Sequence, residues 1–187
     1  MAAAEYLSNQ LLIAMPGMAD PNFSQTVTLI CEHSTRGALG LVINRPLPMT
    51  LNEIFAQMSL ENHDARIGER TVLKGGPVQI DRGFVVHRAG GQWDSTLKVS
   101  DSVHVTTSRD VLAALAGGSG PADAFVALGY AGWQAGQLEE EIRANAWLNV
   151  AASDAIIFNL PFEERWQAAG RLLGIELSRM GSDAGHA

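Results

Sequence analysis

Residues 129–148 read GYAGWQAGQLEEEIRANAWL, and this stretch predicts a helix that begins after two glycines and ends at a tryptophan. An α-helix turns by about 100° per residue, so positions three or four apart share one face. Four polar residues share such a face here: Gln134, Gln137, Glu141 and Asn145. The apolar stripe of the helix, which includes Leu138 and Ile142, lies directly beside them.

The polar face has two interpretations. Side chains that border a buried stripe lose contact with water and must find hydrogen-bond partners. The interpretation we favour is that they tie down the adjoining segments GYAGW and AWL. The alternative is a cleft wall that binds a polar ligand, with Gly129 and Gly132 allowing close backbone approach and Trp133 as an apolar lid.

Outward from this stretch, strand and helix patterns alternate without a repeat of fixed length. Period-two patterns predict strands at 10–14, 26–33, 39–44, 71–74, 83–88, 97–106, 124–128 and 155–158. Helices are predicted from Thr50, where Thr50 and Glu53 have capping-box spacing, and at 109–115 and 162–173. The strands are grouped and outnumber the helices, which predicts an α+β fold.

Composition indicates one domain over residues 1–187, with an ordered core at about 7–175 and a loose C-terminal tail at 176–187. Of the 187 residues 47% are hydrophobic, which is enough for one sizeable core. The apolar runs are far shorter than the roughly 20 residues of a membrane-spanning helix. Glu5 stands where a secretory signal carries positive charge, so we expect a cytoplasmic protein without membrane contact.

Charge argues against direct binding of nucleic acid. The net charge is −7, and no two of the 13 lysines and arginines are adjacent. Electrostatic affinity for DNA needs several cations on one face, and no predicted helix is basic enough to read a groove.

Cysteine and histidine offer only weak chemical signals. Cys31 is the single cysteine, so an internal disulfide is excluded. Cys31 and His33 fall on one strand face, but two residues along a strand span about 6.6 Å, too far for direct activation of a thiol. We therefore favour a core cysteine over a nucleophile or a redox sensor. His33, His87 and His104 have no familiar ligand spacing, and we predict neither a metal nor a cofactor.

Two turns could hold an anion. KGGP at 74–77 supplies a cation and flexible amides, and NRP at 44–46 supplies an amide and a guanidinium. Neither matches a phosphate loop, and the chain holds no complete catalytic signature, so plain turns are the more common interpretation.

Four motifs together resemble the AlgH/YqgE family of bacterial proteins. They are QLLIAMPGMADPNFSQTVTLICEH, GALGLVINRP, GGPV with the following GFVVHR, and LGYAGWQAGQLEEEIRANAWL. The resemblance covers about residues 7–175 in order. It implies an α+β fold with a bifurcated mixed β-sheet and a small barrel-like part surrounded by helices.

The resemblance implies no established activity, cofactor or catalytic residue. The motif positions suggest one cleft for a small polar ligand or a protein partner, lined by His33, Asn44, Arg45, Gly75, Gly76, Pro77, Trp133, Gln137, Glu141 and Asn145.

Three functions stay open. The first is a binding or interaction protein that affects gene expression indirectly, which we place first. The second is a direct DNA-binding transcriptional regulator, which is the label that some family members carry. The third is an enzyme of unknown class that uses His33, Arg45 and Glu141. The oligomeric state is open.

Overall fold

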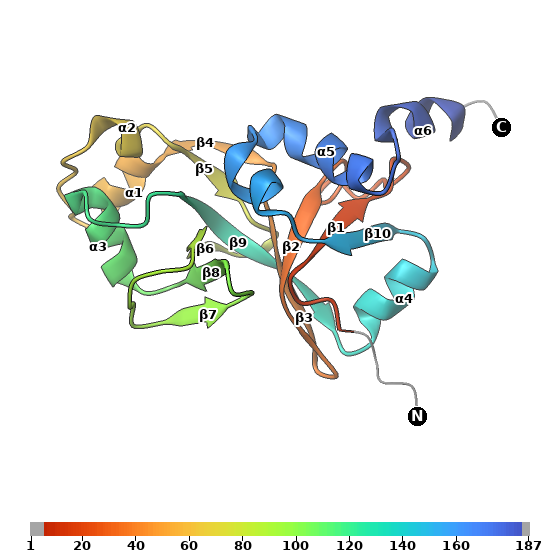
Figure 1. The fold of residues 1–187 in the computed structure, drawn as a ribbon, viewed down its shortest axis with the longest axis horizontal. Coiled ribbons are helices and arrows are strands. Elements are labelled where there is room, and N and C mark those ends of the chain that lie inside the picture. The colour runs from red at the N-terminus through yellow and green to blue at the C-terminus, as the bar shows by residue number, and fades with distance from the viewer. Residues whose placement is uncertain (1–5, 185–187) are drawn as a thin grey trace.

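The computed structural model describes residues 6–184 and contains one ten-stranded sheet with helices around it (Figure 1). The strands are β1 (Gln10–Ala14), β2 (Val27–Ser34), β3 (Gly37–Val42), β4 (Pro46–Thr50), β5 (Thr71–Lys74), β6 (Val78–Arg88), β7 (Thr96–Lys98), β8 (Val103–Thr106), β9 (Ala124–Gln134) and β10 (Trp147–Ala151). The helical segments are α1 (Leu51–Gln57), α2 (Ala65–Gly68), α3 (Arg109–Gly117), α4 (Gln137–Arg143), α5 (Arg165–Leu172), α6 (Leu177–Ala184), the π-helical turn η1 (Ala155–Asn159) and the 3-10 turn η2 (Phe162–Glu164).

The sheet divides at the long strand β9. The main path runs β10-β1-β2-β3-β9-β6-β8-β7, while β5 also pairs with β9 and β4 pairs with β5. The first half of β9 pairs with β5 in parallel and with β6 antiparallel, and its second half pairs antiparallel with β3. This arrangement confirms the predicted α+β fold with a bifurcated mixed sheet and a barrel-like part.

Gly75 lies at the point where β3 and β5 separate. Its N–H donates to the Leu128 carbonyl at 2.7 Å, and its carbonyl accepts from the N–H of Val42 at 2.8 Å. A Cβ on Gly75 would overlap the carbonyl oxygen of Gly129, and one on Gly76 would overlap the backbone of Tyr130. The GGP turn therefore needs glycine because it lies directly on the backbone of β9.

Three groups of buried side chains hold the layers together. The main core joins β1, β2, β3, β6 and β8 to α5. The helical core packs α1 and α3 against β5, β6 and β9, at one end of the molecule (Figure 1). The tryptophan core, with Trp133, Leu138 and Trp147, packs α4 against β1, β2, β9 and β10.

Several local predictions are confirmed. Strands 10–14 and 71–74 begin and end as expected. Thr50 is the N-cap of α1, and its N–H donates to the Glu53 carboxylate at 3.0 Å. The predicted helix at 109–115 is α3, which runs two residues further before Gly118 adopts a φ of +85°.

The prediction of a helix over most of 129–148 was wrong. Residues up to Gln134 belong to β9, and the helix is confined to Gln137–Arg143. Burial alternates along Gly129–Gln134, with Ala131 and Trp133 buried and Gly132 exposed, as in a strand with one face in the core. β10 then follows where the helix was expected to end.

Two further expectations also failed. Residues 155–158 form the π-helical turn η1 rather than a strand, and 97–106 is the hairpin of β7 and β8 rather than one strand. In the tail predicted to be loose at 176–187, the described residues include α6, whose Leu177 is fully buried against Gly170 of α5, and residues 185–187 lie outside the described residues. Among the described residues, no helix is long and apolar enough to cross a membrane.

Candidate functional site

Glu141 ties together the two tryptophans that flank α4. The indole N–H groups of Trp133 and Trp147 both donate to Glu141 Oε1, at 3.0 and 2.9 Å. Gln137 donates to Glu141 Oε2 at 2.8 Å, and its own Oε1 accepts from the backbone N–H of Gln134 at 2.9 Å. These bonds confirm that the polar face of the helix ties down its adjoining segments, chiefly through indole groups.

His33 binds the start of the chain to α4. Its Nδ1 accepts from the backbone N–H of Leu7 at 2.9 Å, and its Nε2 contacts Glu139 Oε1. Because Nδ1 is an acceptor, the ring proton is assigned to Nε2, which donates to Glu139. Both ring nitrogens are therefore occupied, and the side chain is only 1% exposed. His33 is placed to connect segments rather than to transfer a proton to a substrate.

The carboxylate of Glu139 stays ionised beside this ring. Burial by itself would raise the pKa of Glu139. Hydrogen bonds from its own backbone N–H and from His33, together with the charge of Arg143, outweigh burial, and the pKa lies below its ordinary value.

Cys31 is not poised as a nucleophile. It is buried in the main core and occupies the irregularity of β2 between Ile30 and Glu32. Burial, with a smaller contribution from the charge of Glu32, raises the pKa of the Cys31 thiol to about 12. A thiol that stays protonated at neutral pH cannot attack a substrate.

The other two histidines considered as metal ligands, His87 and His104, lie together and apart from His33. His87 and His104 are paired across β6 and β8, with ring centroids 6.0 Å apart. His87 bonds to the Arg88 carbonyl and to Thr106 Oγ1, both at 2.8 Å. Burial lowers the pKa of His87, the bond to Arg88 only partly offsets this, and His104 lowers it further. Within residues 6–184, no group of three or more histidine, cysteine or acidic side chains could hold a metal ion.

Asn44 and Arg45 organise the segment before β2. Asn44 accepts from the N–H of Val27 at 3.0 Å and donates to the Gln25 carbonyl at 2.9 Å. The guanidinium of Arg45 donates to the carbonyls of Pro21 and Ser24. The NRP turn therefore holds this loop in place. Asn44 and Arg45 also line a cavity.

Two cavities near these predicted residues share Pro16 in their lining, and we call them together the Pro16 groove. The apolar end is a cavity of 510 Å³ lined by Met15, Pro16, Gly17, Met18, Asn145, Ala146 and Met180. The polar end is a cavity of 610 Å³ lined by Pro16, Ser24, Gln25, Asn44, Arg45, Glu163, Trp166, Gln167, Leu177 and Ser178.

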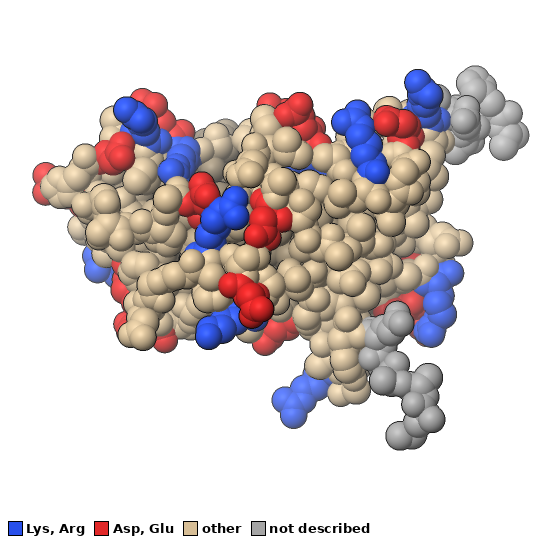
Figure 2. Space-filling model, viewed as in Figure 1, with Lys and Arg blue, Asp and Glu red and all other residues tan. Residues whose placement is uncertain are grey.

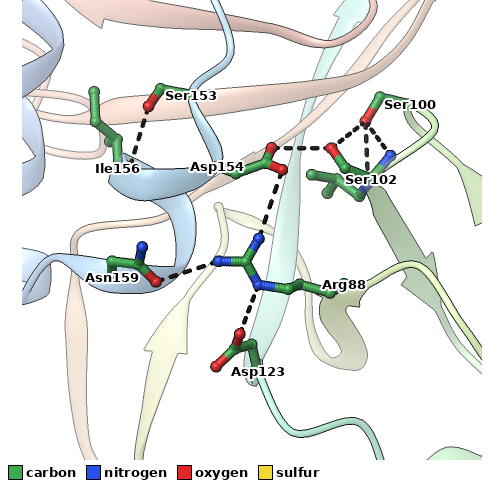
Figure 3. Close-up of polar contacts among 9 residues, drawn as sticks. Arg88, Ser100, Ser102, Asp123, Ser153, Asp154, Ile156 and Asn159 are labelled. Atoms are coloured by element: carbon green, nitrogen blue, oxygen red, sulfur yellow. Dashed lines mark hydrogen bonds and ion pairs between the residues drawn. The ribbon is translucent and has the colours of Figure 1, made fainter.

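A second polar network lies elsewhere and has a structural role (Figure 3). Arg88 pairs with Asp123 at 2.6 Å and with Asp154 at 3.6 Å, and it donates to Asn159 at 3.2 Å. Ser102 adds a bond to Asp154 at 3.0 Å. The network joins the π-helical turn η1 to β6 and β8, and Arg88 neutralises both carboxylates.

The ten residues predicted to line one cleft are thus distributed over different places. Asn44, Arg45 and Asn145 line the Pro16 groove. His33 and Trp133 line a separate 470 Å³ cavity at the β2–β3 hairpin. Gly75, Gly76 and Pro77 belong to the crossing with β9, and Gln137 and Glu141 to the tryptophan clamp. His33, Arg45 and Glu141 bond to three different partners: Glu139, the Ser24 carbonyl and Trp133.

Sequence reasoning missed the methionines and Trp166 of the groove. Met15 and Met18 belong to the motif AMPGM, whose Pro-Gly pair reads as a turn after a strand. Met180 fell in the tail that was expected to be loose. Only the packing of α6 brings it to the groove.

These features define an α+β protein with a bifurcated, half-barrel sheet. A family model described as AlgH-like matches residues 11–178. The chain belongs to this AlgH-like family.

Relatives match it over all or nearly all of their length. A UPF0301 protein of Thioalkalivibrio sulfidiphilus is 54% identical over 187 residues, which is 100% of both chains. One from Ralstonia nicotianae is 55% identical and covers 97% of this chain and 95% of the relative.

Solved structures show the same fold. The solution structure of the AlgH protein from Pseudomonas aeruginosa has a TM-score of 0.80 and 49% identity, covering 100% of this chain and 99% of that one. A crystal structure of protein DIP2367 from Corynebacterium diphtheriae has a TM-score of 0.71 over 97% of this chain and 94% of that one. At 18% identity, this second likeness supports the fold alone.

Proposed function

We propose that this protein is a binding protein that holds a segment of a partner protein in the Pro16 groove. The observation that carries the proposal is that a methionine-lined, apolar cavity and a polar cavity with Arg45 lie on either side of the same residue, Pro16. Three predicted site residues, Asn44, Arg45 and Asn145, face the groove. Any effect on gene expression is then indirect and acts through the partner, in the cytoplasm.

The apolar end suits a side chain of the partner. Met15, Met18 and Met180 line it. Methionine side chains are flexible and polarizable, and they are common where a surface adapts to partners of different shape. Apolar area removed from water contributes about 25 cal/mol per Å², so one buried apolar side chain is a useful anchor.

The polar end suits main-chain and polar groups. The guanidinium of Arg45 is oriented by the carbonyls of Pro21 and Ser24. Asn44, Gln167 and Ser178 offer further donors and acceptors, and Glu163 adds a negative charge. A peptide backbone presents both N–H and C=O groups, which this mixture can satisfy.

The alternatives have less support. A DNA-binding role needs a basic face, yet the net charge is −7 and blue and red side chains are interspersed on the face in Figure 2. An enzyme that uses His33 would need a free ring nitrogen, and both are occupied.

Gly17→Phe tests the proposal because a Cβ on Gly17 meets no atom within 4 Å, so the new ring can fill the groove without disturbing the fold. The matched control is Gly117→Phe at the end of α3, where a Cβ also has open space. Native mass spectrometry of protein purified gently from bacterial cytoplasm reports bound mass and oligomeric state together.

We expect wild type and Gly117→Phe to carry a polypeptide partner and Gly17→Phe to lose it. If the bound mass is a small molecule instead, the proposal of a protein partner is overturned and the ligand is of the small polar class. Retention of the same bound mass by Gly17→Phe would show that the groove is not the site.

A further inference from the structure

A separate cavity lies beside the main core, between β2, β3, β6, β7 and β8. It has a volume of 230 Å³. Its floor is apolar and consists of Cys31, Leu39, Phe84, Leu97 and Val105. Its rim is polar and consists of Glu32, Arg82, Ser95, Thr96 and Thr107. None of these residues lines the Pro16 groove, so this cavity is independent of the function proposed above.

The irregularity in β2 creates one side of the cavity. Ile30 pairs with Gly40 and Glu32 pairs with Leu39, so Cys31 is the extra residue of a bulge. A bulge re-aims the side chains around it. Here Cys31 contributes to the floor and the next residue, Glu32, contributes to the rim.

The rim holds two opposite charges that lack protein partners. The Arg82 guanidinium lies over the Phe84 ring, 5.1 Å from its centroid. Among residues 6–184, neither Arg82 nor Glu32 forms an ion pair or a side-chain hydrogen bond. Arg88, six residues further along β6, shows the contrast because it contacts two carboxylates and an amide.

Hydroxyl groups complete the rim. Thr107 Oγ1 donates to Ser95 Oγ at 3.1 Å, and Thr96 Oγ1 lies 2.8 Å from Thr106 Oγ1. A hydroxyl that has one partner keeps further hydrogen-bonding capacity. The rim can therefore bind both an anionic and a cationic group.

We propose that this cavity binds a free α-amino acid with an apolar side chain. The ligand's carboxylate would face Arg82, its ammonium group would face Glu32, and its side chain would lie on Leu39, Phe84, Leu97 and Val105. Small-ligand sites are commonly apolar with a few placed polar groups, and the mouths of β-barrels are one of their usual positions.

The size of the cavity limits the ligand. At about 30 Å³ for each water in the liquid, the cavity corresponds to roughly eight water molecules. That volume suits leucine or a similar amino acid. A ligand with only one charge would leave the other rim group without a partner.

Calorimetric titration with three matched compounds tests this assignment: L-leucine, 4-methylpentanoate, which lacks the amine, and 3-methylbutylamine, which lacks the carboxylate. We expect saturable one-to-one binding of L-leucine and at least tenfold weaker binding of each analogue. Equal binding of 4-methylpentanoate would overturn the amino-acid assignment, as would equal binding of the amine or no saturable binding of L-leucine at millimolar concentration.

Two variants locate the site. Arg82→Gln and Glu32→Gln keep the size of each side chain and remove its charge, and each should weaken L-leucine binding at least tenfold. The controls are Arg66→Gln and Glu69→Gln, two exposed charges near α2, which should leave binding unchanged. Binding that all four variants retain would contradict the proposal.

Methyl NMR supplies a second measurement that does not depend on the variants. L-Leucine should shift the methyl signals of Leu39, Leu97 and Val105, and it should leave those of Leu51 and Leu112 in the helical core unchanged. Shifts confined to residues outside the cavity would place the ligand elsewhere and overturn the assignment.

Discussion

Trp133 and Trp147 meet edge to face, with ring centroids 6.1 Å apart and planes inclined at 75°, and both indole N–H groups point at the same oxygen of Glu141. Trp133 is the last residue but one of β9 and Trp147 is the first of β10, so one carboxylate joins two strands that are not neighbours in the sheet. Phe23 packs against both rings.

We expect Glu141→Ala to destabilise the protein by about 2–4 kcal/mol, because each buried donor left without an acceptor costs about 1–3 kcal/mol. Glu141→Gln keeps one acceptor oxygen and should cost less. Urea unfolding followed by tryptophan fluorescence measures the difference. Glu140→Ala, on the exposed side of α4, is the control, and an equal effect of the two alanine variants would contradict the clamp.

Gly76→Ala should be the most damaging glycine substitution in the motifs. A Cβ there overlaps the backbone of Tyr130, which cannot move without disrupting β9, so we expect a loss of at least about 3 kcal/mol or failure to fold. Gly132→Ala is the control, since its Cβ comes no closer than 3.5 Å to the Tyr130 ring. Similar melting temperatures for both variants would refute the close crossing.

Because of Glu139, the free energy of unfolding should fall as the pH is lowered. Its pKa in the folded protein lies below the ordinary value of 4.5, so its contribution is fully present above that value and is lost as the pH falls through the lower, folded-state pKa. We therefore expect wild type to be more stable than Glu139→Gln at pH 7 and the difference to shrink below pH 4.5. Thermal unfolding across pH 3–7 measures this, and a constant difference would count against the His33–Glu139 contact.

Cys31 should resist modification in the folded state. With a pKa of about 12, only about one thiol in ten thousand is ionised at pH 8, and the side chain is buried. Mild peroxide or a thiol-specific reagent should leave Cys31 intact in buffer and modify it in urea. Rapid modification without denaturant would instead support a redox-sensing thiol.

Arg88→Ala should increase local opening of η1 and lower the free energy of unfolding of the whole protein only slightly. Its ion pairs are more than a third exposed, so each contributes at most about 1 kcal/mol. Loss of the contacts with Asp154 and Asn159 releases η1 from the sheet (Figure 3). We expect faster amide hydrogen exchange at 155–159, while exchange in α1 stays unchanged.

Local physics accounts for the elements that sequence predicted correctly. Strand 10–14 is an apolar run bounded by turn residues, and the spacing of Thr50 and Glu53 marks the start of α1. Both signals depend only on neighbours within four residues, so the sequence alone reveals them. The same local reasoning placed a helix on Gly129–Gln134. There, pairing with β3 and β6 overrides the weak helical preference of a short, glycine-containing segment.

The predicted site shows the same division. Polar spacing indicated that Gln137 and Glu141 have hydrogen-bond partners, and both do. Asn44 and Arg45, predicted in a turn that could hold an anion, bond instead to the loop before β2. The partners themselves lie up to 24 residues away in the sequence, as for Arg45 and Pro21. The predicted cleft is divided in the structure. The NRP and GGP turns are neighbours, since the N–H of Lys74 donates to the Arg45 carbonyl, but Asn44 and Arg45 face the Pro16 groove while Gly75 and Gly76 pack on the backbone of β9.

The amino-acid sequence by itself determined the α+β class, the family and the residues that carry unusual polar or glycine positions, because composition, periodicity and motif spacing are properties of the chain. Only the tertiary structure decided that β9 is the shared strand, that His33 is a connector, and that the methionines of α6 and the Pro16 turn form a groove. These three features depend on packing between segments that are distant in the sequence. Which side chains are buried and which polar groups find partners there depends on the whole fold, so no short stretch of sequence predicts it.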